Sequence, residues 1–255
     1  MIFDMENAKK EFLKYTENYD LENEHIERKQ LHSLRVMEIS KQISEKLGLT
    51  QEENELASLI GLLHDIARFE QYTQYKTFKD LQSFDHGDFG AKILRNDIRK
   101  YIETNQYDEI IIKAVKNHNK FKIEEGIAEK EELFSKIIRD ADKIDIFYES
   151  VEMFWKGKEK EVEESVISKD MIEQFKILSQ KKRKVEETTL DRVIRVITFI
   201  FDVNFKSSLQ IIKEEDYINK ILNRYNFKDE RTRQQVEEIR IIANEYMNRK
   251  LKEGK

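Results

Sequence analysis

The chain has 255 residues, a net charge of −5 at pH 7, no Cys, no Pro and only 7 Gly. The absence of Cys excludes a disulfide framework, a thiolate zinc site and a cysteine nucleophile. The negative charge argues against general binding to nucleic acid. The most apolar stretches, 56–63 and 193–201, are far shorter than the roughly 20 residues that cross a bilayer, so no membrane partner is expected.

Two further features of the composition indicate the fold class and the location. Charged residues make up 38% of the chain, against roughly 25% in ordinary globular proteins, and this excess suits thin helical layers with many solvated faces. Without Pro and with few Gly, the chain lacks the strongest helix breaker and the usual residues of tight β-turns. We therefore predict an all-α fold. The acidic amino end has no apolar segment typical of a secretory signal, which predicts a cytoplasmic protein.

Apolar periodicity predicts helices along most of the chain. Gly48 lies where a helix C-cap belongs, and Thr50 with Glu53 forms the pattern of a capping box that opens the next, largely apolar helix. We expect a loop over 69–85, where the periodicity is lost. The expected helices cover 5–18, 24–47, the region around 56–63, 87–102, 107–118, 130–149, 159–182, 187–213 and 229–252.

A shift of composition near Gly157 suggests two parts, a core over residues 1–150 and a helical carboxyl-terminal extension over 151–255 packed on that core. The basic run 181–184 has acidic segments on both sides, so we interpret it as a solvated charge run and not as a nucleic-acid contact.

The residues with the clearest chemical meaning are His64 and Asp65, which follow the apolar run 56–63. A buried carboxylate costs several kcal/mol unless a charge neutralises it, and a divalent cation would do so directly. The dipeptide alone is weak evidence, because a histidine at a helix end paired with its neighbour has the same pattern.

Four more residues extend the pattern: His32 in HSLRV, His86 in HGDFG, His118 in VKNH and Asp142 in RDADKID. Together with GLLHDIAR, these segments, in this order and over about residues 24–150, resemble the HD-domain metal-dependent phosphohydrolases. The resemblance implies an all-α HD-domain helical bundle, with the helical carboxyl-terminal extension outside the core motif.

The resemblance also implies a centre with one or two divalent ions, and ligands without thiolate suit Mn, Fe, Co, Ni or Zn. One ion would be held by His32, His64, Asp65 and Asp142, and a second by His86, His118 and the other oxygen of Asp65. An ion-bound hydroxide would attack phosphorus, and Asp65 would be a catalytic residue as well as a ligand. Alternatively, His86 starts a helix and His118 caps one, with a single ion bound.

Cationic residues near these motifs could bind the substrate. Arg68, on the helix face of His64 and Asp65, is predicted to contact the phosphate as a catalytic and substrate-binding residue, the alternative being a salt bridge to a neighbouring acid. Arg35 is a second candidate for substrate binding, and Lys143 is a third.

Two acids near Asp142 and one further histidine complete the set of candidates. Asp140 and Asp145 compete with Asp142 by periodicity, and only the family pattern selects Asp142; Asp145 could instead orient a ligand histidine. His25 matches no motif position and is expected to be a solvated surface residue.

The predicted function is therefore metal-dependent hydrolysis of a phosphomonoester or phosphodiester, with a nucleotide or a similar small molecule as substrate. Two alternatives stay open: a non-catalytic sensor of the same fold that binds metal and nucleotide, and a helical interaction protein whose histidines are structural. The sequence identifies neither the substrate nor the native metal, and it leaves the oligomeric state open, with a homodimer as one option.

Overall fold

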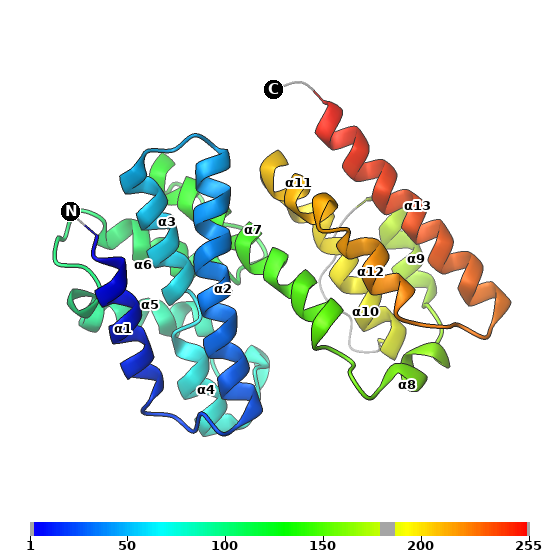
Figure 1. The fold of residues 1–255 in the computed structure, drawn as a ribbon, viewed down its shortest axis with the longest axis horizontal. Helices are drawn as coiled ribbons and strands as arrows, with labels where there is room; N and C mark the ends of the chain where they lie inside the picture. Colours follow the sequence, from blue (N-terminus) through cyan, green and yellow to red (C-terminus); the bar gives the residue numbers. More distant parts are fainter. Residues whose placement is uncertain (1–2, 179–186, 254–255) are drawn as a thin grey trace. The chain divides into compact units, whose positions relative to one another are not determined.

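The computed structural model describes residues 3–178 and 187–253. Over these residues the chain consists of helices and connecting segments with no β-strand, which confirms the all-α class (Figure 1). The chain forms two compact units, residues 1–142 and 143–255. The predicted division at residue 150, and the packing of the second part on the first, stay predictions. None of the described helices combines the length and the apolar character that crossing a membrane requires.

The first unit contains all of the predicted ligands. Its elements are α1 (Met5–Thr16), α2 (Glu24–Lys46), α3 (Gln51–Leu63), α4 (Ala67–Tyr75), the 3-10 helix η1 (Asp80–Gln82), α5 (His86–Asp97), η2 (Ile98–Lys100), α6 (Asp108–Asn117) and the first part of α7 (Glu129–Glu152).

The structure confirms the two predicted helix ends, at Gly48 and at Thr50. Gly48 has a φ of +72°, the left-handed conformation that ends α2 without steric cost. Thr50 and Glu53 form the capping box of α3: Glu53 N–H donates to Thr50 Oγ1 at 3.3 Å, and Thr50 N–H donates to Glu53 Oε2 at 3.1 Å. These contacts pair backbone N–H groups that the helix leaves unbonded, and they fix where α3 begins.

Helices α2 and α3 lie side by side in the first unit (Figure 1). From Leu56 to Leu63 every residue of α3 is buried, in agreement with the largely apolar sequence of this helix. Gly61 lies close to α2, because an added Cβ atom there would be 2.7 Å from the Val36 carbonyl oxygen and 2.8 Å from Met37 Cα. The missing side chain therefore lets the two backbones meet just before the His64–Asp65 pair.

The predicted loop over 69–85 was wrong for its first part, because α4 continues to Tyr75 and η1 follows. The helix is stabilised by Phe69, which is fully buried and packs against the rings of Phe12 and Tyr19 at centroid distances of 5.9 and 5.6 Å. The many Tyr and Gln residues on its exposed side hide this narrow apolar stripe from a periodicity search.

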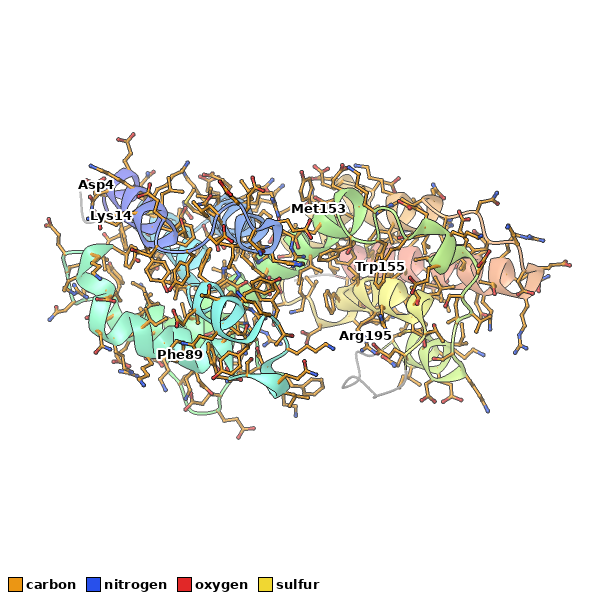
Figure 2. The ribbon with its side chains drawn as sticks, turned by 90° about the horizontal axis from the view of Figure 1, so that it is seen from below. Asp4, Lys14, Phe89, Met153, Trp155 and Arg195 are labelled. Carbon is orange, nitrogen blue, oxygen red and sulfur yellow. The ribbon has the colours of Figure 1, made fainter. Side chains whose placement is uncertain are left out.

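The second unit contains shorter helices than predicted. They are α8 (Glu159–Glu163), α9 (Lys169–Lys176), α10 (Thr189–Ile197), η3 (Thr198–Asp202), α11 (Lys206–Glu214), α12 (Tyr217–Asn223) and α13 (Glu230–Lys252). The expected helix over 229–252 is confirmed. Trp155, in the turn after α7, has a φ of +63° (Figure 2).

The continuous helices predicted over 159–182 and 187–213 were wrong. Ser168 starts a separate helix by accepting a hydrogen bond from Met171 N–H at 3.2 Å. Its own N–H donates to Asp191 Oδ1 at 2.9 Å, so the break between α8 and α9 is held in place by α10. The basic run 181–184 lies outside the described residues.

The close approach at Gly61 leads to a prediction about stability. We expect Gly61→Ala to lower the free energy of unfolding by about 1–3 kcal/mol, because the added methyl group overpacks the contact between α2 and α3. Urea denaturation followed by circular dichroism measures the change. Ser40→Ala in the same chain should not rescue it, since Val36 and Met37 meet the methyl group with backbone atoms. A Gly61→Ala protein as stable as the wild type would contradict the prediction.

Candidate metal centre

The six predicted ligands come from five helices or helix ends of the first unit and converge on one place. His32 lies within α2, His64 caps the C-terminus of α3, and Asp65 follows it. His86 starts α5, His118 caps the C-terminus of α6, and Asp142 lies in α7. All of them are buried except Asp142, which is half-buried.

Asp142 joins His32 and His64 in a first group of ligand atoms. His32 Nε2 lies 3.2 Å from His64 Nε2, and Asp142 Oδ1 lies 3.2 Å from His32 Nε2 and 3.8 Å from His64 Nε2. These three atoms are close enough to share one metal ion. Asp145 and Glu149 form another such group with His32, so the selection of Asp142 over Asp140 and Asp145 stays a prediction.

His86 and His118 form a second group on the other side of Asp65. Their Nε2 atoms lie 3.0 Å apart, and each is equally close to Asp65 Oδ1, at 3.5 Å for His86 and 3.4 Å for His118. The other oxygen, Oδ2, lies 3.5 Å from His32 Nε2 and 3.6 Å from His64 Nε2. One carboxylate thus bridges the two groups, with one oxygen facing each.

The partners of the Nδ1 atoms assign the tautomers of three of these histidines. His64 Nδ1 donates to the Gly61 carbonyl at 2.8 Å, and His118 Nδ1 donates to the Val115 carbonyl at 2.6 Å. His86 Nδ1 lies 2.7 Å from an oxygen of Asp80 and donates to it. The Nε2 atoms that point into the centre therefore carry lone pairs, and lone pairs at 3.0 Å repel each other unless a cation lies between them.

A proton on His64 or His86 is not that cation near neutral pH. Burial lowers the pKa of His64 to about 3, and burial together with the charge of Arg68 lowers the pKa of His86 to about 4. Both rings are consequently neutral at pH 7. Burial alone would raise the pKa of Asp65, but the positive charge of Lys29, together with that of Arg68, outweighs it and holds the pKa well below its usual value, so the carboxylate is ionised.

Neutral imidazole nitrogens and ionised carboxylates, buried and facing one another, form a donor set that fits divalent ions with nitrogen and oxygen ligands. Residues 31–146 match the family model described as HD domain. This segment is an HD domain. The match contains all six predicted ligands and confirms the resemblance to the HD-domain metal-dependent phosphohydrolases, whose members generally are hydrolases that bind divalent metals. No curated protein and no solved structure matches the chain.

Asp80 is a residue of the HD domain that the sequence did not single out. Its carboxylate accepts hydrogen bonds from His86 Nδ1, from Gln71 Nε2 at 2.9 Å and from Asn119 Nδ2 at 3.2 Å. Burial opposes its ionisation, but the hydrogen bond from His86 and the nearby positive charges lower its pKa. Asp80 thus fixes the tautomer and the ring orientation of His86, as carboxylates behind metal-binding histidines do.

Arg68 makes the salt bridges that were its alternative role. Its Nη1 donates to Asp80 Oδ1 at 3.1 Å and to the Phe78 carbonyl at 2.7 Å, and its Nε lies 3.5 Å from Asp65 Oδ1. Among the described residues no acceptor receives a hydrogen bond from the buried Nε atom. The contact with phosphate stays a prediction, and this donor beside the bridging carboxylate is available for it.

Lys29 and Arg139 are further residues that the sequence did not single out. Lys29 Nζ lies 2.7 Å from Asp65 Oδ2 and pairs with it. The buried Arg139 donates to the carbonyl oxygens of Asn117, at 3.2 Å, and Lys120 around the end of α6. Arg139 therefore holds the helix end that carries His118.

The remaining candidates have varied surroundings. Arg35 is half-buried on α2, and its role in substrate binding stays a prediction. Lys143 pairs with Asp202 at 2.9 Å in the second unit. The role of Asp145 in orienting a histidine stays a prediction. The side chain of His25 is 44% exposed, and the centroid of its ring lies 4.8 Å from the centroid of the Tyr72 ring.

The low pKa values lead to a prediction about the chelator-treated protein. Between pH 6.5 and about 4, the unfolded chain binds protons on His64 and His86 that the folded chain does not bind. Stability should therefore fall as the pH is lowered through this range, by up to about 1.4 kcal/mol per pH unit for each histidine. Urea denaturation at a series of pH values measures the slope. His64→Gln should reduce it, and a stability independent of pH over this range would contradict the prediction.

The contact between Asp80 and His86 leads to a second prediction. Asp80→Asn should weaken metal binding by about 10–100-fold, because an amide neither stabilises the positive charge that develops on the imidazole nor fixes its tautomer as firmly. Isothermal titration with Mn²⁺ measures the affinity. Asp88→Asn is the matched control, since it removes a carboxylate two residues from His86 on the exposed face of α5. Equal affinities in the two variants would refute the role of Asp80.

Proposed function

We propose that the HD domain is a metal-dependent phosphohydrolase with two divalent ions, acting on a nucleotide or a similar small phosphate ester. The observation that carries the proposal is the bridging position of Asp65, with Oδ2 facing His32 and His64 and Oδ1 facing His86 and His118. A mononuclear site would need only one of these pairs, so the second pair favours two ions over one.

His32, His64, Asp142 and Oδ2 of Asp65 would hold one ion, and His86, His118 and Oδ1 of Asp65 would hold the other. When bound, the ions would supply Lewis acidity that activates water and neutralises the charge of a phosphate group. Mn, Fe, Co, Ni and Zn all suit nitrogen and oxygen donors of this kind.

The chain itself supplies binding and orientation. Arg68 would donate from Nε to a phosphate oxygen, while its Nη1 contacts with Asp80 and the Phe78 carbonyl keep the guanidinium in a fixed position. Arg35, three residues after His32 on α2, would be a second contact to the substrate. Because the side chain of Arg68 is largely buried, its attraction for an anion would be only weakly screened by water.

The sensor that binds metal and nucleotide without turnover is the second candidate, since the same donor set would serve it. The interaction protein with purely structural histidines is disfavoured by the facing lone pairs of His86 and His118, which a packing role leaves unexplained. A cytoplasmic location and a homodimer are further proposals that rest on the sequence.

The function can be tested by elemental analysis of the purified protein together with hydrolysis of an aryl phosphate and a panel of nucleotides. We expect bound transition metal and phosphate release that a chelator abolishes. Asp65→Asn should reduce the rate by at least about 100-fold, because it removes the charge shared by both ions. Asp97→Asn, a partly exposed carboxylate paired with Lys100, is the matched control.

Three results would distinguish the hypotheses. Nucleotide binding without phosphate release by a metal-loaded protein would establish the sensor instead. Activity of a metal-free protein would contradict the proposed mechanism. A rate for Asp65→Asn equal to that of the control would do the same.

A further inference from the structure

Three cationic side chains lie around the ring of Phe78, beside the metal centre. Lys29 Nζ lies 5.6 Å from the ring centroid, Arg68 Cζ also lies 5.6 Å from it, and Arg28 Cζ lies 5.8 Å from it. Like charges repel at such separations, so the arrangement needs compensation. The negative face of the ring supplies part of it, and the carboxylates of Asp65 and Asp80 supply more.

This cluster of Phe78, Arg28, Lys29 and Arg68 is held in place by the same helices that position the ligands. Arg28 and Lys29 are four and three residues before His32 on α2, so they lie one turn from it on neighbouring faces. Phe78 is fixed by the hydrogen bond from Arg68 to its carbonyl and by Tyr72, whose ring centroid lies 4.9 Å away.

The cluster extends outward from the ligands toward solvent. The side chain of Asp65 is 3% exposed, that of Lys29 is 13% exposed, and Phe78 and Arg28 are half-buried. An anion held at the centre could therefore continue into the cluster, with Lys29 as the first positive group beyond the bridging carboxylate.

Lys29 is the residue whose partner changes most when the centre is filled. Its ammonium group now pairs with Asp65 Oδ2 at 2.7 Å, the oxygen that faces His32 and His64. A divalent ion at that oxygen would repel the ammonium group and take up the negative charge that now stabilises it. The flexible stem of lysine allows the group to turn to another anion, and a phosphate group is a suitable one.

We propose that Lys29 and Arg28, on the ring of Phe78, form a subsite for a second phosphate group, so that the preferred substrate is a diphosphate or triphosphate ester. The inference rests on the proposed function, which places the first phosphate group at the ions and Arg68. A phosphomonoester supplies no anion that could replace Asp65 as the partner of Lys29 once the ions are bound. A neighbouring phosphate group provides that anion.

The inference can be tested by binding, without turnover. Isothermal titration of the Mn²⁺-loaded protein with inorganic pyrophosphate and with orthophosphate, at equal free Mn²⁺, compares two phosphate groups with one. We expect pyrophosphate to bind at least about tenfold more tightly. Lys29→Met should abolish most of this preference, whereas Lys29→Arg should keep it. Lys46→Met removes a charge from the exposed end of the same helix and is the matched control.

Arg28→Met provides a second variant, because Arg28 Cζ lies 5.8 Å from the centroid of the Phe78 ring. This variant should also lower the preference for pyrophosphate. The metal content of each variant is measured, so that a loss of bound metal is not mistaken for a loss of the subsite. Equal affinity of the wild type for the two anions would overturn the subsite, and so would an equal loss for both anions in the two variants. If a monoester is still hydrolysed in that case, only the subsite fails; if neither anion binds and no ester is hydrolysed, the proposed function fails.

Discussion

The carboxylate of Asp65, placed between four imidazole nitrogens, is the constraint on which the rest of the centre depends. Its two oxygens lie 3.4–3.6 Å from the Nε2 atoms of His32, His64, His86 and His118. Removing such a charge from water is costly, and neutral histidines do not offset the cost. Lys29 and Arg68 provide partial compensation, so the fold keeps an ionised group in its interior at the point where two sets of ligands meet.

The same local device positions one histidine in each set. His64 and His118 both cap the C-terminus of a helix, and each donates from Nδ1 to the carbonyl three residues earlier, Gly61 in α3 and Val115 in α6. A helix end leaves such carbonyls without a backbone partner, so one contact satisfies the carbonyl and assigns the tautomer. The ring is then held with its lone pair toward Asp65. Helix ends are suited to orienting a histidine ring, because a backbone carbonyl accepts the hydrogen bond and no additional polar side chain has to be buried.

The sequence predicted correctly those features whose signals lie within one or two helical turns, and it missed several features that depend on residues further away. The apolar run before His64, the capping box of α3 and Gly48 all act within one or two turns, and the structure uses them as predicted. Asp80 escaped notice because it lies in the segment 69–85, where we expected a loop, although its partner His86 is only six residues away. Lys29 escaped notice because its partner Asp65 is 36 residues away. The breaks in the second unit had local signals too. Ser168 caps α9 and Thr188 caps α10, but the apolar periodicity on both sides concealed them.

A continuous network of hydrogen bonds and ion pairs links the centre to the residues around it. His86 donates to Asp80, Asp80 accepts from Arg68, and Arg68 Nε lies 3.5 Å from Asp65 Oδ1. Arg68 and Lys29 then meet at the ring of Phe78. Each group in this series of contacts has a partner of opposite charge or a π face. A change of charge at Asp65 therefore alters the electrostatic interactions of Arg68, Lys29 and Asp80. A divalent ion at Asp65 would therefore take up negative charge that Lys29 and Arg68 now share, and more of the positive charge at the Phe78 ring would be left for an anionic ligand.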